Sequence, residues 1–116
     1  MYQIVYYRTL RGDCPVLEFI ESLDEKAARK VEAFIELLGQ KGPDLHRPYA
    51  DKIRGPICEL RVQFAHRSIR TLYFFMHGAD IVLLHSFLKR TDAVEERDVR
   101  LAESRMLDWL NRNGGQ

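Results

Sequence analysis

The sequence predicts an α+β fold in which helices pack on one mainly antiparallel sheet. Three patterns support this: helical spacing of apolar residues between positions 13 and 38, alternation of polar and apolar residues from position 49, and a last helical pattern after position 91. With a strand before them, the elements follow in the order β-α-α-β-β-β-α. The length of 116 residues predicts a single domain, residues 1–116.

The first part of the chain is expected to form a strand and two helices. Residues 2–8 are rich in aromatic and β-branched side chains, which favour strands. Asp13 is an expected N-cap, with Pro15 in the first turn of a short helix. Asp24 is a second expected N-cap, for a helix over residues 25–38 that ends at the following glycines. The two helices are expected to form a hairpin on one sheet face.

Four further elements are expected in the rest of the chain. Residues 49–54, between two prolines, predict a short strand, and residues 57–64 alternate in polarity as a half-buried strand does. Residues 69–76 predict its partner. The nearly continuous apolar run 81–88 predicts a central strand that is buried on both faces.

The last helix is expected to begin at Thr91-Asp92. Asp92 and Glu95 have the spacing of a capping box, in which each side chain bonds the other residue's backbone. The apolar face of this helix is supplied by Val99, Ala102, Met106, Trp109 and Leu110.

Positive charge is concentrated in the middle of the chain. The net charge is only +1, but residues 44–90 carry eight Lys and Arg against four Asp and Glu. A locally basic surface suits a polyanion even when the net charge is near zero. No apolar run is long enough for a membrane span and no signal-peptide pattern is visible, so we expect a cytoplasmic protein without a membrane partner. Cys14 and Cys58 are expected to be free thiols.

Arg61 and Arg70 are the first candidates for a site. A two-residue loop at His66-Arg67 would place both on the same sheet face, with Arg61 opposite Leu72. Arginines that point the same way repel each other unless an anion lies between them. The alternative interpretation is a solvated or salt-bridged sheet face.

Further candidates lie near the end of the apolar run. Lys89 and Arg90 follow it directly, and the free N–H groups of the last helix, close behind, could also bind a phosphate. Only one of the two can share a face with Arg61, because adjacent strand residues face opposite sides. The alternative is an ordinary basic pair at a strand end. His85 is more easily explained as a hydrogen-bonded core residue than as a base. No histidine has a partner at metal-ligand spacing.

Three segments form a larger pattern. Residues 49–62 contain a Glu-Leu-Arg strand, residues 68–74 contain Arg-x-Leu-Tyr, and residues 81–91 end in Leu-Leu-His-x-Phe-x-Lys-Arg-Thr. In this order, with helices before them and one after, they resemble the RelE/HigB superfamily of type II toxins, in particular its phage-derived HigB branch. The resemblance spans essentially the whole chain.

This resemblance implies a RelE-like microbial RNase fold and a metal-independent endoribonuclease without a cofactor. Such an mRNA interferase cuts mRNA at the ribosomal A site and inhibits translation. The implied partners are the ribosome, mRNA and a cognate helix-turn-helix antitoxin. By motif position, the catalytic residues would be Arg61, Arg70, Lys89 and Arg90. The RNA-binding residues would be Lys52, Arg54, Arg67 and Tyr49.

The sequence departs from the family's pattern after Thr91, where the family commonly continues with lysine, threonine and proline and this chain has residues 92–95. Arginines are poor bases because a guanidinium stays protonated. The proton acceptor is therefore open between His85, Glu59, a lysine and a group of the ribosomal RNA. Two other functions also stay open: a ParE-like, non-enzymatic inhibitor of DNA gyrase, and an inactive domain that only binds its antitoxin.

Overall fold

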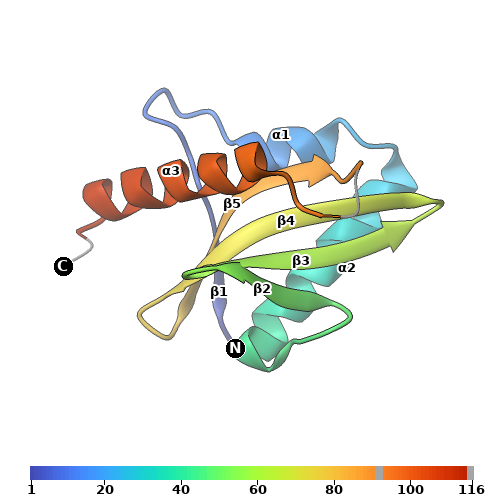
Figure 1. Ribbon diagram of the computed structural model, residues 1–116, viewed down its shortest axis with the longest axis horizontal. Coiled ribbons are helices and arrows are strands. Elements are labelled where there is room, and N and C mark those ends of the chain that lie inside the picture. The colour runs from blue at the N-terminus through green and yellow to red at the C-terminus, as the bar shows by residue number, and fades with distance from the viewer. Residues whose placement is uncertain (91–92, 115–116) are drawn as a thin grey trace.

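A five-stranded sheet between two helical layers makes up the computed structural model, which describes residues 1–90 and 93–114. The elements are β1 (Gln3–Tyr6), α1 (Pro15–Glu21), α2 (Glu25–Lys41), the 3-10 helix η1 (Gly42–Asp44), β2 (Ala50–Arg54), β3 (Ile57–Phe64), β4 (Arg67–Met76), β5 (Asp80–Leu88) and α3 (Glu96–Arg112). The strand order in the sheet is β1-β5-β4-β3-β2 (Figure 1). Only the β1–β5 pair is parallel. The predicted α+β class is confirmed, and the architecture is compatible with a RelE-like fold.

Helices α1 and α2 cover one face of the sheet. Asp24 is the N-cap of α2, as expected, and its carboxylate accepts a hydrogen bond from the Ala27 backbone at 3.3 Å. The predicted N-cap Asp13 is wrong, because α1 begins at Pro15 and its N-cap is Cys14, which makes no side-chain cap. The core between these helices and the sheet consists of Val16, Ile20, Val31, Ile35, Leu38, Leu60, Val62, Ile69, Tyr73, Ile81 and Leu83.

Helix α3 packs on the opposite face and begins later than expected. Its first residue is Glu96 and its N-cap is Glu95, whose side chain makes no cap. The predicted capping residue Asp92 lies outside the described residues. The buried core on this side consists of Tyr7, Ile57, Leu72, Phe74, Val82, Leu84 and Ala102.

The turn between β3 and β4 is one residue earlier than expected. It consists of Ala65 and His66, whose φ angles are 48° and 67°. Two consecutive positive φ angles give a tight hairpin whose twist matches that of the strands. As a result, Arg61 lies directly opposite Arg70, and the predicted pairing of Arg61 with Leu72 is wrong. The prediction that the two arginines share a face is confirmed, because directly opposed residues point to the same side of the sheet.

A bulge in β5 changes which way its second half faces. Leu72 of β4 lies opposite His85 while the next residue, Tyr73, lies opposite Leu83, so Leu84 is the extra residue. Both Leu84 and His85 consequently face α3, where they pack and hydrogen-bond. Strand β5 is an interior strand, as the apolar run predicts, although β4 is the middle one.

The structure also bears on the two cysteines and on membrane-spanning helices. Cys14 and Cys58 are both free thiols, the first buried and the second half-buried. Within the described part of the chain, no helix combines the length and apolarity that crossing a bilayer requires.

Candidate active site

Arg61 and Arg70 lie side by side on the sheet face that α3 packs against, beyond the part that α3 covers. Figure 1 shows α3 crossing one end of this face and leaving the end near the β3–β4 turn uncovered. The carboxylate of Glu59 joins the two arginines: Arg61 Nε donates to its Oε2 at 2.9 Å, and Arg70 Nε lies 3.1 Å from its Oε1. We call the surface formed by Glu59, Arg61 and Arg70 the arginine face.

The members of the arginine face differ in their access to solvent. Glu59 is 2% exposed and Arg70 8%, whereas the Arg61 side chain is 33% exposed. Burial lowers the pKa of the Arg70 guanidinium, and the attraction of Glu59 partly offsets this. The Arg70–Glu59 contact lacks hydrogen-bond geometry and is an ion pair. Arg61 is thus the group that can reach a ligand, while Arg70 supplies charge from beneath.

The ion-pair chain continues onto β2. Asp51 Oδ2 lies 3.8 Å from Arg61 Nη2 and accepts a hydrogen bond from Arg47 Nε at 2.8 Å. This bond to Arg47 holds the pKa of the Asp51 carboxyl below its ordinary value. Sequence reasoning missed Asp51 and Arg47. Asp51 has a signal in the strand alternation, because it pairs with Glu59 in the β2–β3 register and so points to the same face.

Tyr49 lies beside the arginines. It lines a hollow of about 370 Å³ together with Arg61, Arg70 and Lys30 of α2, and it is 46% exposed. Its backbone carbonyl accepts a hydrogen bond from the Arg61 N–H at 2.8 Å. An exposed aromatic ring next to guanidinium groups is the arrangement on which a nucleotide base can stack while its phosphate meets positive charge. Lys30, on α2, was not a sequence candidate.

His85 shares the sheet face with the arginines. Its Nε2 lies 2.8 Å from Asp98 Oδ1 of α3, and its ring stacks on Phe87 at 5.0 Å between centroids. Burial lowers the His85 pKa, while the bond to Asp98 acts in the opposite direction. With Nε2–H donating to Asp98, the neutral imidazole keeps Nδ1 as a proton acceptor. The sequence hint for Asp98 was its spacing of four from Ala102 on the inward face of α3.

Lys89 and Arg90 follow β5 and line a hollow of about 280 Å³ with Phe87 and Asp98. The Lys89 N–H donates to the Ser68 carbonyl at 2.8 Å, which extends the strand pairing by one residue. The predicted helix start directly after Arg90 is wrong, and the phosphate site expected there stays a prediction. Helix α3 does not start there, and its first turn carries acidic side chains that repel an anion.

Three predicted RNA-binding residues lie away from the arginine face. Arg54 is held by two carboxylates of α3, Glu96 at 3.0 Å and Glu103 at 3.1 Å, which raise its pKa. Arg67 pairs with Asp24, the N-cap of α2, at 2.8 Å on the opposite side of the sheet. Lys52, the third residue, also lies on that opposite side of the sheet, because its Cα partner in β3 faces α2.

A family model described as "Phage derived protein Gp49-like" matches residues 18–107. The matched part includes β2 to β5 and every candidate residue of the site. No curated protein matches the sequence significantly.

Proposed function

The chain belongs to the family of phage-derived Gp49-like proteins, which is related to toxin–antitoxin systems, and from this premise we propose that it is a toxin that cleaves mRNA on the ribosome. One observation carries the proposal: Arg61 and Arg70 are direct neighbours across β3 and β4, held by one buried carboxylate at the open end of the sheet. The proposed partners are a cognate helix-turn-helix antitoxin, the ribosome and mRNA, all in the cytoplasm.

The proposed reaction is attack of a ribose 2′-hydroxyl on the adjacent phosphate. It passes through a phosphorane with two negative charges, and guanidinium groups stabilise such charge by bidentate hydrogen bonds. Arg61 is the accessible donor and Arg70 the buried charge behind it. Glu59 fixes both side chains before the substrate arrives, so little reorganisation is needed when charge develops.

Proton removal is assigned to His85 in this proposal. Burial favours its neutral form near neutral pH, and Asp98 orients the ring, which is how a general base is usually prepared. Glu59 is less suited, because both of its oxygens already face arginines and it is 2% exposed. The ribosome would position the mRNA for in-line attack, which contributes much of the barrier reduction.

Toeprinting on translating ribosomes tests the proposal. The purified protein should cut mRNA in the A site, and Arg61→Ala should reduce the cutting rate by about 100-fold, as expected for loss of one charge-stabilising donor. Arg29→Ala is the matched control, because Arg29 is an exposed arginine on the distant surface of α2.

Two results would contradict this proposal. Undiminished cutting by a folded Arg61→Ala, Arg70→Ala double variant would remove the arginine face as the site. Inhibition of gyrase supercoiling by a protein that leaves mRNA intact would replace the nuclease with a ParE-like inhibitor.

A further inference from the structure

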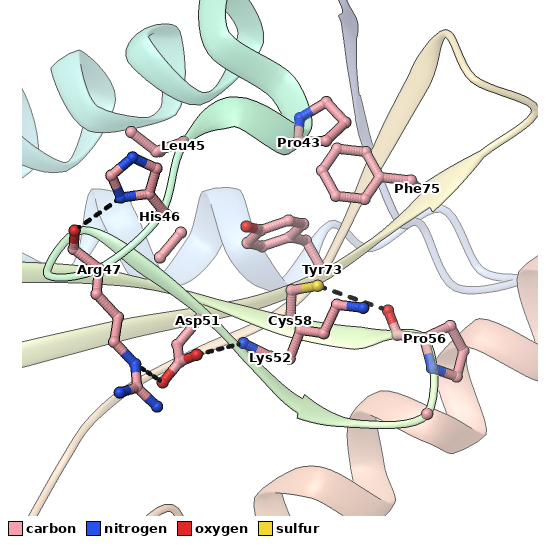
Figure 2. A pocket seen from close by; sticks show the side chains of 12 residues that line it. Pro43, Leu45, His46, Arg47, Asp51, Lys52, Pro56, Cys58, Tyr73 and Phe75 are labelled. Carbon is pink, nitrogen blue, oxygen red and sulfur yellow. Dashed lines mark hydrogen bonds and ion pairs between the residues drawn. The ribbon is translucent and has the colours of Figure 1, made fainter.

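A separate hollow of about 630 Å³ lies on the other side of the sheet from the arginine face, next to the end of α2 (Figure 2). It is bounded by η1, the loop after it, and strands β2, β3 and β4. Pro43, Leu45 and Phe75 supply apolar walls. A hollow of this size and lining is typical of sites for small organic molecules.

The floor of this cavity contains a row of polar groups. Lys52, Cys58 and Tyr73 are successive Cα partners across β2, β3 and β4, so their side chains stand next to one another on the same face. Figure 2 shows the Tyr73 ring among the lining residues, with its hydroxyl directed into the space that they enclose. The row therefore borders an otherwise largely apolar hollow.

The Tyr73 hydroxyl lacks a partner although the residue is buried. Tyr73 is 2% exposed, and its hydroxyl forms no hydrogen bond with any residue that the structure describes. Burial raises its pKa, so it stays a protonated donor. The hydroxyl oxygen itself is not fully enclosed, because it is open to the hollow that Tyr73 lines. The cavity thus offers a donor that a bound acceptor would satisfy.

Lys52 adds an available positive charge. Its ammonium group forms no ion pair with a described residue, because the neighbouring carboxylate of Asp51 is engaged by Arg47 and Arg61 instead. The Cys58 thiol, next in the row, is turned to the Pro56 carbonyl at 3.8 Å. Asp51 and Arg47 also line the hollow, but they are paired with each other at 2.8 Å. Beside that pair, the polar row presents one hydroxyl donor and one cation.

We propose that this cavity binds a small molecule with an apolar, ring-sized body and a terminal carboxylate. The body packs between Pro43, Leu45 and Phe75. The carboxylate accepts hydrogen bonds from the Tyr73 hydroxyl and the Lys52 ammonium, which gives the unpartnered hydroxyl an acceptor and pairs the free charge. The site is on the opposite face from the arginine face and goes beyond the proposed nuclease function, on which it does not depend.

Titration of the full chain with 4-phenylbutyrate, followed by amide chemical shifts, tests the site. We expect the largest shifts at Leu45, Cys58 and Phe75, and much weaker binding of the uncharged 4-phenylbutan-1-ol. Tyr73→Phe and Lys52→Met should each weaken 4-phenylbutyrate binding about tenfold, as expected for one hydrogen bond to a charged group. Lys26→Met, at an exposed position of α2, is the matched control and should bind as the unchanged chain does.

Three results would overturn the proposal. The first is absence of binding at millimolar 4-phenylbutyrate. The second is equal binding of the alcohol and the carboxylate. The third is unchanged affinity in Lys52→Met, an exposed substitution that does not depend on the fold being tolerant at Tyr73. Shifts at the same amides with a purified antitoxin, but with no carboxylate, would assign the cavity to a protein partner instead.

Discussion

At the scale of single residues, Glu59 determines the character of the arginine face. Its carboxylate is almost fully buried and contacts both guanidinium groups. Two arginines directly opposite each other in a sheet would repel, and the anion between them removes that repulsion. The same contact limits how much positive charge the face can offer to RNA. Glu59 is therefore both a structural and an electrostatic component of the site.

Replacing Glu59 tests this double role. Glu59→Gln leaves the buried Arg70 without its counter-charge, and loss of one partner of a buried pair lowers the free energy of unfolding by about 3 kcal/mol. Urea denaturation measures the change. Glu25→Gln, which breaks the exposed pair with Arg29, is the control and should leave the unfolding midpoint nearly unchanged. A stability of Glu59→Gln equal to that of the unchanged chain would show that the pair contributes nothing.

The buried imidazole of His85 makes stability depend on pH. Its folded pKa is below the ordinary value of about 6.5, so the unfolded state takes up the proton first as the pH falls. The stabilising effect of the neutral ring is complete above the unfolded pKa and is lost as the pH falls below it. We expect the midpoint temperature of thermal unfolding to depend less steeply on pH, between about pH 5 and 7, in His85→Gln than in the unchanged chain. His46→Gln, at an exposed loop residue, should keep the slope of the unchanged chain.

The sequence predicts some of these residue positions and not others. That Arg61 and Arg70 share a face follows from period-two alternation and was correct. The turn was predicted one residue too late, which shifts the partner of Arg61 by two residues, because Ala65 has little intrinsic preference for positive φ and does not mark the turn. The position of His85 depends on the bulge at Leu84, which no residue type in the apolar run indicates.

At the scale of elements, the β3–β4 hairpin sets the arginine register through its turn. Ala65 and His66 both adopt the left-handed region, which costs a residue with a Cβ about 1 kcal/mol. The substitutions Ala65→Asn and His66→Gly suit this turn and should together raise the free energy of unfolding by about 1 kcal/mol. Urea denaturation checks this.

Gly55, in the turn between β2 and β3, allows the reverse test, in which backbone strain is added and not removed. Its φ is +55°, and a Cβ added there would meet nothing within 4 Å. Gly55→Ala should therefore lower the free energy of unfolding through backbone strain alone, with no steric clash. If Gly55→Ala were neutral and the turn variant were no more stable, backbone strain would not be the controlling factor at either turn.

Helix α3 neutralises one of the basic residues that the sequence assigned to RNA. Arg54 lies between Glu96 and Glu103, so its charge is already paired. We expect Glu96→Gln with Glu103→Gln to raise the affinity for single-stranded RNA several-fold, because it frees a cation for a phosphate. Fluorescence anisotropy with a labelled oligonucleotide measures it.

The control for this helix changes the same number of charges elsewhere. Glu25→Gln with Glu36→Gln alters two exposed carboxylates of α2, which covers the other face of the sheet. An equal gain in RNA affinity for both double variants would mean that net charge alone is responsible and that Arg54 has no special place.

At the scale of the whole molecule, the sheet separates two surfaces with different chemistry. The face toward α3 carries the arginine face and His85, and the face toward α1 and α2 carries the apolar cavity. The order of elements and the two-sided core were predictable from the periodicity of apolar residues. The partition of basic residues between the faces was not, because it depends on side-chain partners such as Asp24 for Arg67 and the α3 carboxylates for Arg54.

This partition predicts a shallow salt dependence of RNA binding. If only about two cations meet phosphates, the logarithm of the affinity should fall with the logarithm of the salt concentration at a slope of about −1.4. Arg61→Ala should make the slope less steep by about 0.7. Anisotropy titrations over a range of potassium chloride concentrations give both values. A slope near −5 would show that the basic residues of both faces contact RNA.

The parallel pairing of β1 with β5 has a consequence for how the protein folds during its synthesis. Gln3 and Asp80 are partners in the sheet, so β1, which is synthesised early, cannot pair until β5 has been synthesised. Pairings so distant along the chain close slowly, and they close only when most of the polypeptide has been synthesised. His85 meets Asp98 later still. In a nascent chain the arginine face can therefore form within the β3–β4 hairpin, whereas the His85–Asp98 contact is absent until α3 has been synthesised.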